Sequence, residues 1–393
     1  MNWLRRITRK EGYPLRKAPQ KNSKGYLFTL KEFKDGFQIM KIKSITISDC
    51  CKNGEIPSKG NLSFKLITKS ECIEKHNLAW PTKNILYSEK DVIYISKDMF
   101  PGIVISSVDC KSIASPFTLS INGVKEWKGI QKNAENVFLK ETIIPIGAFR
   151  NSLVKEIYTQ EIFDMGIGGC EGCYYLTTFD WPDNVKTIPA CFFQGCFNLD
   201  ISKILCKVTS LDSFSLSGCR TDVFDLTNIF FCSSYAFSGL KCHTLIWSNH
   251  MHKITSLDVF ADVATGFNYV TAIEPGAFEG ACIHRLDLSD AKVNELSNLS
   301  WYEEGSEIEE IVWPVACKHM KKDVFNFIRN LKHIFFNDQD FLSVEKGTLS
   351  KIVNTLYSID FSPIMSLCIT SDNIDSLSNA NIPVSFSYYV TVL

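Results

Sequence analysis

Two clusters of side chains have the composition of a metal or redox site. Cys170 and Cys173 are separated by two residues, as in zinc-binding and redox-active cysteine pairs. His250 and His252, with His243 nearby, are spaced so that two imidazoles on a strand would point the same way and could bind a transition metal. These patterns lack a second cysteine pair at similar spacing and a third ligand in register. We therefore predict that the chain holds no metal and no cofactor.

Carboxylates are concentrated in one short segment. Glutamate occupies five of eight consecutive positions there, namely Glu303, Glu304, Glu307, Glu309 and Glu310. Catalytic carboxylates need environments that separate their pKa values, whereas this run is typical of a solvated insert or, alternatively, of an acidic contact patch. The sequence also has no P-loop, dinucleotide-binding fingerprint, nucleophile elbow or HExxH motif. These observations predict a protein that is not an enzyme.

The elements that position these side chains are repeats. Gly-Cys occurs three times at intervals of 23 residues, from Gly172 to Cys219. Trp181, Trp247 and Trp313 are 66 residues apart, which is three periods of 22. A fixed period of this size is the signature of a solenoid, in which each coil packs only against its neighbours. The cysteines at repeat positions are then explained as small buried residues of successive coils rather than as ligands.

Two signatures alternate within the period. The first is a large apolar residue, the anchor, which is followed two residues later by Gly or Asn and is predicted to fill the interior of its coil. The predicted anchors are Phe149, Cys170, Phe193, Leu216, Phe237, Phe260 and Phe278. The second signature is a short strand with alternating apolar residues, such as Thr178–Trp181 or Arg285–Leu288. One such strand per coil would stack into a parallel sheet.

The pattern I-P-x-x-A-F-x-G-C, followed by L-x-x-Φ-x-W/L-P, resembles the BspA-like leucine-rich repeats, over about residues 141–371. The resemblance implies a leucine-rich-repeat solenoid, a β-rich α/β fold with short parallel strands on one face and turns or short helices on the other. It also implies a recognition surface for other proteins, because family members are often bacterial cell-surface adhesins. The chain departs from that picture, since Arg and Lys interrupt the segment where an export signal would need an apolar run.

Four segments are predicted. Residues 1–25 carry eight Lys or Arg side chains against one Glu and form a basic tail. Residues 26–140 are predicted to be a β-rich flank, with degenerate coils from about residue 90. Residues 141–371 are the leucine-rich repeats, and residues 372–393 are predicted to cap the open end of the solenoid.

The strand pattern predicts where a partner would bind. If alternate apolar residues point inward, the intervening residues of each strand point outward from the sheet. These residues are Thr178, Asp180, Val223, Asp225, Thr244, Ile246, Arg285, Asp287, Glu310, Val312, His333 and Phe335. One row on this face is mostly acidic early and apolar late, and exposed apolar residues in a line mark interaction sites. We predict a protein partner along this face; the pattern specifies neither its identity nor the oligomeric state.

Two alternatives arise from other features. Residues 1–25 could bind nucleic acid or an anionic membrane surface, with the repeats as a targeting arm. Without an export signal, the chain is predicted to be cytoplasmic, with its cysteines reduced. Export by a non-classical route would instead make it a cell-surface or secreted adhesin. No segment approaches the roughly 18 apolar residues of a membrane span.

Overall fold

The structure is a computed structural model that divides into two compact units. The first comprises residues 1–185 and 195–199, and the second comprises residues 186–194 and 200–393. Backbone and side chains are described for residues 116–124, 127, 132–296 and 306–393, and the backbone alone for the strands before residue 110. The basic tail predicted for residues 1–25 therefore lies outside the described residues except for Gly25, and so do Glu303 and Glu304.

Described strands of the first unit pair in parallel, apart from β1 with β2. Their bounds are β1 (Gly25–Tyr26), β2 (Ile45–Thr46), β3 (Gly60–Thr68), β4 (Ile85–Ser88), β5 (Val92–Ser96), β6 (Ile103–Asp109), β7 (Phe117–Asn122), β8 (Ala134–Ile144), β9 (Glu156–Met165) and β10 (Thr178–Phe179). One sheet has the order β10-β9-β8-β7-β5, and another has the order β4-β3-β6. In the larger sheet each strand lies beside the strand of the next coil, as in a solenoid.

The second unit is built from the same kind of coil. Its elements are β11 (Thr187–Ile188), α3 (Ser202–Leu205), β12 (Ser210–Leu211), β13 (Arg220–Asp225), β14 (Phe231–Cys232), β15 (Leu240–Ile246), β16 (Lys253–Ile254), β17 (Val259–Thr265), β18 (Ala272–Ile273), β19 (Cys282–Asp287), β20 (Ser306–Val312), β21 (His319–Met320), β22 (Ile328–Arg329), β23 (His333–Phe335), β24 (Gln339–Val344), the 3₁₀ helix η4 (Leu349–Lys351), β25 (Ser358–Asp360), β26 (Ile364–Ile369), α4 (Ser371–Asn379), β27 (Val384–Ser385) and β28 (Tyr389–Val392).

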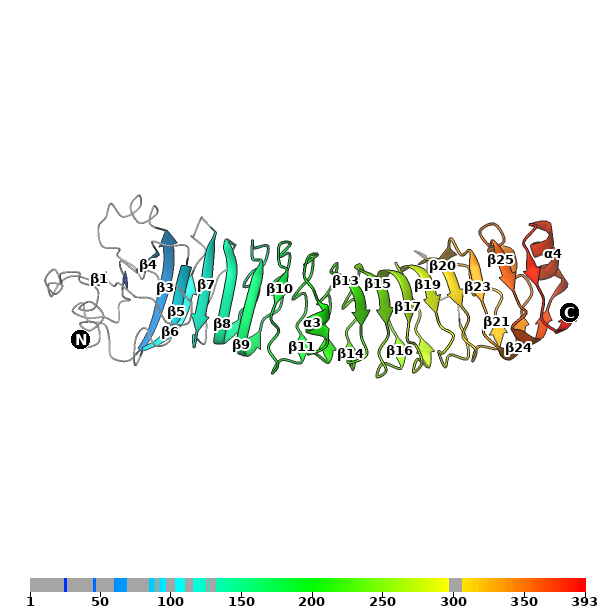
Figure 1. The fold of residues 1–393 in the computed structure, drawn as a ribbon, viewed down its shortest axis with the longest axis horizontal. Helices are drawn as coiled ribbons and strands as arrows, with labels where there is room; N and C mark the ends of the chain where they lie inside the picture. The colour runs from blue at the N-terminus through cyan, green and yellow to red at the C-terminus, as the bar shows by residue number, and fades with distance from the viewer. Residues whose placement is uncertain are drawn as a thin grey trace. The chain divides into compact units, whose positions relative to one another are not determined.

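A nine-stranded sheet forms one side of the second unit. Its order is β13-β15-β17-β19-β20-β23-β25-β27, with β22 beside β20, and every pair is parallel. Consecutive coils contribute consecutive strands, which lie side by side in chain order (Figure 1). The other side carries shorter strands in the orders β11-β12-β14, β16-β18 and β21-β24-β26-β28. The predicted solenoid with short parallel strands on one face is confirmed. The opposite face differs from the prediction, because in the described residues it carries short parallel strands as well as turns, and little helix.

Side chains in register on successive strands form the core. One inward row of the nine-stranded sheet, with each residue exposed by 2% or less, is Phe224, Leu245, Ala264, Leu286, Ile311, Ile334 and Ile359. Burying one large apolar side chain contributes about 1.5–3 kcal/mol. Because every coil adds a residue to the row, the hydrophobic contribution grows with the number of coils.

The anchors form a second column, and backbone hydrogen bonds fix their register. Phe193 N–H donates to the carbonyl just before Leu216, Leu216 N–H to the one just before Phe237, and Leu257 N–H to the one just before Phe278. All five are buried. The predicted column is therefore confirmed within this unit, but Phe260 is not part of it. Phe260 lies on the outer face of β17 with 41% of its surface exposed, and Leu257 is the anchor of that coil.

The three tryptophans occupy one repeated environment. Trp181, Trp247 and Trp313 are at most 2% exposed. Each indole Nε1–H donates to the carbonyl oxygen four residues later, at 2.8, 3.1 and 2.8 Å respectively. A buried indole needs such a partner because its N–H can no longer form a hydrogen bond to water. The 66-residue spacing therefore reflects a repeated core position.

Candidate functional site

The outer face of the nine-stranded sheet carries most of the residues predicted to bind. Ten of the twelve lie on β13, β15, β19, β20 and β23 of this sheet. Thr178 and Asp180 are also exposed, but they belong to the first unit, where Thr178 begins β10. They are therefore not part of this surface.

Two rows on this face follow from the strand register. The first row is Val223, Thr244, Val263, Arg285, Glu310 and His333. The second contains Asp225, Ile246 and Thr265 on β13, β15 and β17, and Asp287, Val312 and Phe335 on β19, β20 and β23. Val263 and Thr265 lie on β17, a strand that we did not predict.

The prediction that Val312 is exposed is wrong, because its exposed fraction is 2%, although the register keeps it in the second outer row. It lies on β20, between β19 and β23. The Arg285 guanidinium carbon, from β19, is 4.8 Å from the centroid of the Phe335 ring on β23. This contact joins the strands on either side of β20, the strand that carries Val312. Phe335 itself keeps 36% of its surface exposed.

Three aspartates at the ends of strands share a structural role. Asp225, Asp287 and Asp360 each accept a hydrogen bond through Oδ1 from the backbone N–H two residues later, at 2.9, 3.0 and 2.9 Å. This arrangement is an Asx-turn, which directs the chain out of the strand. The acidic character of this row is thus partly explained by the turns that follow the strands.

We expect Asp287→Ala to lower the free energy of unfolding by about 1 kcal/mol, because it removes the acceptor for Ser289 N–H and for the Ser289 hydroxyl, which donates at 2.7 Å. Asp287→Asn keeps an Oδ1 acceptor and removes only the charge, so it should stay close to wild type. Urea denaturation followed by circular dichroism measures both. Equal losses in the two variants would contradict the turn role.

A third row also faces outward, and in each coil its residue directly precedes the residue of the first row. Ile283 and Leu286 on β19 are both buried, and His284 and Arg285 between them both face outward. The register places equivalent residues on the neighbouring strands β13, β15, β17 and β20, and Lys332, just before β23, lies beside Glu309. This carboxylate–histidine row consists of Asp222, His243, Asp262, His284, Glu309 and Lys332. Its sequence signal is a charged residue or histidine just before each first-row position.

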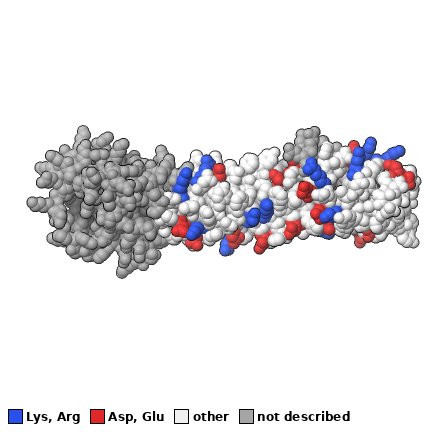
Figure 2. Space-filling model, turned by 90° about the horizontal axis from the view of Figure 1, so that it is seen from above, with Lys and Arg blue, Asp and Glu red and all other residues white. Residues whose placement is uncertain are grey.

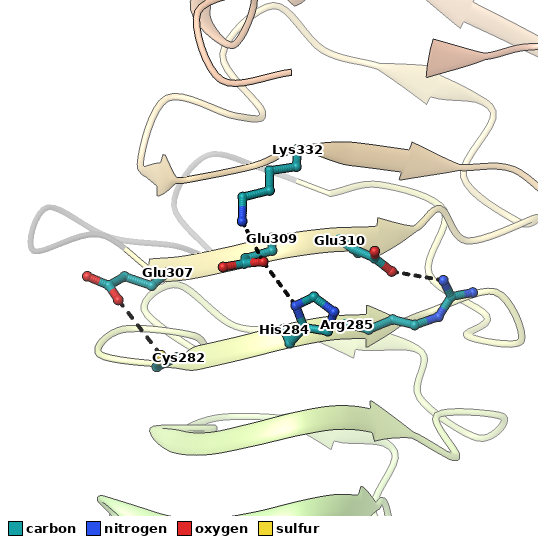
Figure 3. Close-up of polar contacts among 7 residues, drawn as sticks. All are labelled: Cys282, His284, Arg285, Glu307, Glu309, Glu310 and Lys332. Atoms are coloured by element: carbon teal, nitrogen blue, oxygen red, sulfur yellow. Dashed lines mark hydrogen bonds and ion pairs between the residues drawn. The ribbon is translucent and has the colours of Figure 1, made fainter. Parts of the chain in front are cut away.

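Three of the five clustered glutamates take part in cross-strand pairs, as Figure 3 shows for β19 and β20. Glu309 Oε2 lies 3.0 Å from His284 Nδ1 and 2.8 Å from Lys332 Nζ. Arg285 Nη1 donates to Glu310 Oε2 at 3.0 Å. Glu307 faces Cys282. The prediction of a solvated insert is therefore wrong for these glutamates, which alternate with the buried Ile308 and Ile311 along β20.

Hydrogen bonds shift the pKa values of several groups in the carboxylate–histidine row. The bond between His243 and Asp262, 2.5 Å from Nδ1 to Oδ2, raises the pKa of His243. The bond from Lys332 lowers the pKa of Glu309 and raises that of Lys332. Protonated His243 therefore adds stability at low pH that is lost as pH rises through its raised pKa, whereas ionised Glu309 adds stability that is lost as pH falls through its lowered pKa. Solvent screens these exposed pairs, so their effect on folding is small.

Exposed apolar side chains accompany the charges. Lys241 Nζ lies 5.0 Å from the centroid of the Phe260 ring, which parallels the contact of Arg285 with Phe335. Val223 has 44% of its surface exposed. On the face in view in Figure 2, basic and acidic side chains are interspersed among uncharged ones and form no single-sign field. This mixture of aromatic, aliphatic and charged groups is what protein interfaces contain.

A sequence model of the BspA-type leucine-rich repeat region matches residues 164–264 and 264–368, with six copies. The chain belongs to the BspA-type leucine-rich repeat family. The crystal structure of a leucine-rich repeat protein from Bacteroides ovatus is similar, with 14% sequence identity, coverage of 70% of this chain and 82% of that chain, and a TM-score of 0.28. No curated protein matches the chain. Family membership indicates a protein-interaction or adhesin-like repeat protein, and solenoids of this BspA-type family are generally non-enzymatic.

The buried cysteines of this BspA-type chain belong to the core, as predicted. In the first unit, Cys173 Sγ donates to the carbonyl of the anchor Phe149 at 2.9 Å and Cys196 Sγ to that of Cys170 at 3.1 Å. In the second unit, Cys219 Sγ donates to the carbonyl of the anchor Phe193 at 3.2 Å. Burial raises the pKa of Cys170, so its thiol is poorly suited to become a thiolate ligand, whereas at Cys173 burial is outweighed by hydrogen bonds with Cys170 and Ser152, which lower the pKa of that thiol.

The His250–His252 pair lies in a loop before β16, so the common orientation that two such residues would have on a strand does not apply. The His250 ring stacks on Phe230 with centroids 3.8 Å apart. His252 Nδ1 lies 3.0 Å from the carbonyl oxygen of Tyr269. Within the described part of this BspA-type repeat protein, no three His, Cys, Asp or Glu residues are grouped to hold a metal, and no helix has the length and apolarity of a membrane span.

Proposed function

We propose that the outer face of the nine-stranded sheet is a binding surface for a protein partner. The observation that carries the proposal is a pair of exposed cation–aromatic contacts, Lys241 with Phe260 and Arg285 with Phe335. Both contacts lie on one continuous parallel sheet. Aromatic side chains and arginine dominate the energetic centres of protein interfaces.

The rigidity of the surface favours binding. Phe260 and Phe335 project from strands whose backbone bonds to a neighbouring strand on each side. A partner that docks there orders few additional backbone groups, which reduces the entropic cost of association. The mixture of acidic and basic side chains favours a protein over nucleic acid, whose phosphates call for a strongly basic field.

Phe260→Ala combined with Phe335→Ala is expected to weaken capture of the native partner by about 30-fold or more, since loss of an interface hot spot costs about 2 kcal/mol or more. The measurement is affinity capture by the full-length chain from its native cells, followed by the Kd of the purified partner. Both rings are exposed on the sheet surface, so the double variant should fold.

Phe231→Ala is the matched control. Phe231 has 56% of its surface exposed, but it lies on β14, which belongs to the short strands of the other side. The control should retain the partner with wild-type affinity. Wild-type binding by the double variant, or a loss that appears only with Phe231→Ala, would reject this face as the binding surface.

A further inference from the structure

The carboxylate–histidine row has a charge that depends on pH. Carboxylates stand on β13, β17 and β20 at Asp222, Asp262 and Glu309. The imidazoles of His243 and His284 lie on the strands between them, β15 and β19. Lys332 is the residue directly before β23. With neutral imidazoles the row has a net charge of −2, and with both imidazoles protonated its net charge is 0. Imidazoles ordinarily titrate near pH 6.5, so the change falls in a physiological range.

The groups around each imidazole are mostly acidic. His243 lies 2.5 Å from Asp262 on β17 and interacts electrostatically with Asp222 on β13. Lys241 is two residues earlier on the same strand as His243. His284 faces Glu309 on β20 at 3.0 Å and lies in register with Asp262 on β17, with Arg285 next to it. Lys332 Nζ donates a hydrogen bond to Glu309 Oε2 from the side of β20 opposite His284. All six side chains of the row are at least partly exposed.

We propose that this row binds a basic, Lys- or Arg-rich segment of the partner and releases it on acidification. The proposal rests on the proposed function, because it assigns to the same face the chemistry of the partner and a dependence of binding on pH. It does not depend on the aromatic contacts by which that function is tested.

The direction of the effect follows from charge. At neutral pH and above, the carboxylates outnumber the cations of the row, and their oxygens can accept charge-assisted hydrogen bonds from lysine or arginine. On acidification each imidazolium forms an internal ion pair with its own carboxylate and cancels the charge that attracts a basic segment. The hydrogen bond from Lys332 lowers the pKa of Glu309, which keeps this carboxylate ionised in this range. The raised pKa of His243 places its protonation early in the acidification.

The test uses the full-length chain and a fluorescent decalysine peptide, titrated by anisotropy at low salt at pH 7.5 and pH 5.5. Lysine side chains stay protonated at both values, because their pKa is about 10.4. We expect the wild-type affinity for decalysine to fall by about fivefold or more at pH 5.5, as expected for losing two attractive charges near the surface. His243→Gln with His284→Gln should reduce this pH dependence to about twofold or less. A decaglutamate peptide should bind more weakly than decalysine at pH 7.5.

His250→Gln with His252→Gln is the matched control. It removes the same number of imidazoles from the loop before β16, away from the row, and should keep the wild-type pH dependence. Wild-type pH dependence in His243→Gln/His284→Gln, an equal loss in the control, or no preference for decalysine over decaglutamate would overturn the proposal. A native partner captured equally at both pH values would also overturn it, while leaving the sheet face as the binding surface.

Discussion

Replacing Trp247 with alanine is expected to lower the free energy of unfolding by about 3–5 kcal/mol, because a large core side chain is lost and a cavity remains. The indole is 2% exposed and packs against the Phe267 ring, with centroids 5.8 Å apart. It also satisfies the Met251 carbonyl oxygen through Nε1–H at 3.1 Å. Close packing of the core leaves little room for neighbouring side chains to move into the cavity. Urea denaturation followed by far-ultraviolet circular dichroism measures the loss.

Two further variants separate the contributions to this loss of unfolding free energy. Trp247→Phe keeps an aromatic ring and removes the N–H donor, so it should cost less than alanine, by the contribution of one buried hydrogen bond and the smaller ring volume. Phe335→Ala, on the exposed sheet face, should stay within about 1 kcal/mol of wild type. An alanine variant at Trp247 that is as stable as the Phe335 variant would show that the tryptophan does not occupy a rigid core position.

The interior of the second unit could be predicted from the repeat spacing in the sequence, because similar residues occupy equivalent positions in successive coils and pack against one another. Phe193, Phe237 and Phe278 recur within a Gly-terminated motif, and the backbone bonds between coils put them in one column. The glycine two residues after the anchor has a positive φ in each of these coils, between 68° and 76°. Only glycine adopts that conformation without steric cost. Packing and backbone geometry therefore reinforce the same period.

One coil was misread because two apolar residues compete for the anchor position. Leu257 and Phe260 are three residues apart, and the larger side chain of Phe260 makes it the better anchor on sequence alone. The structure selects Leu257, since its N–H meets the carbonyl before Phe278. Phe260 then begins an outward row beside Lys241 and Cys282. The strand that carries Phe260, β17, was missed as well, since two of its three inward residues are the small Ala261 and Ala264.

The carboxylate–histidine row escaped sequence analysis for a geometric reason. A strict two-residue alternation allows one outward residue between two inward ones. On β19 the inward residues Ile283 and Leu286 are three apart, so His284 and Arg285 share the outer face. The same holds on β20, where Glu309 and Glu310 lie between Ile308 and Ile311. Alternation alone identified the second residue of each pair and missed the first.

In the first unit, Gly166→Ala is expected to lower the free energy of unfolding by about 3 kcal/mol or more, because an added methyl group would collide with backbone atoms. A Cβ at Gly166 would lie 2.3 Å from Ile146 N and 2.6 Å from the Pro145 carbonyl carbon. The Gly166 N–H also donates to the Ile144 carbonyl at 2.6 Å, which holds the two segments together. Relief of the collision would require the chain at residues 144–146 to move away and break this bond. Thermal and urea denaturation measure the loss.

Gly147→Ala serves as the matched control because it adds the same methyl group to the same unit without a collision. The nearest atom to its Cβ would be Arg150 Nε at 3.7 Å, so only the positive φ of 60° is unfavourable. That conformation costs an alanine about 1–2 kcal/mol. The Gly166 variant should therefore be clearly less stable than the Gly147 variant. The reverse order would mean that the segments at residues 145–146 and 166 are not in close backbone contact, and that the coils of the first unit are spaced more widely than a packed solenoid allows.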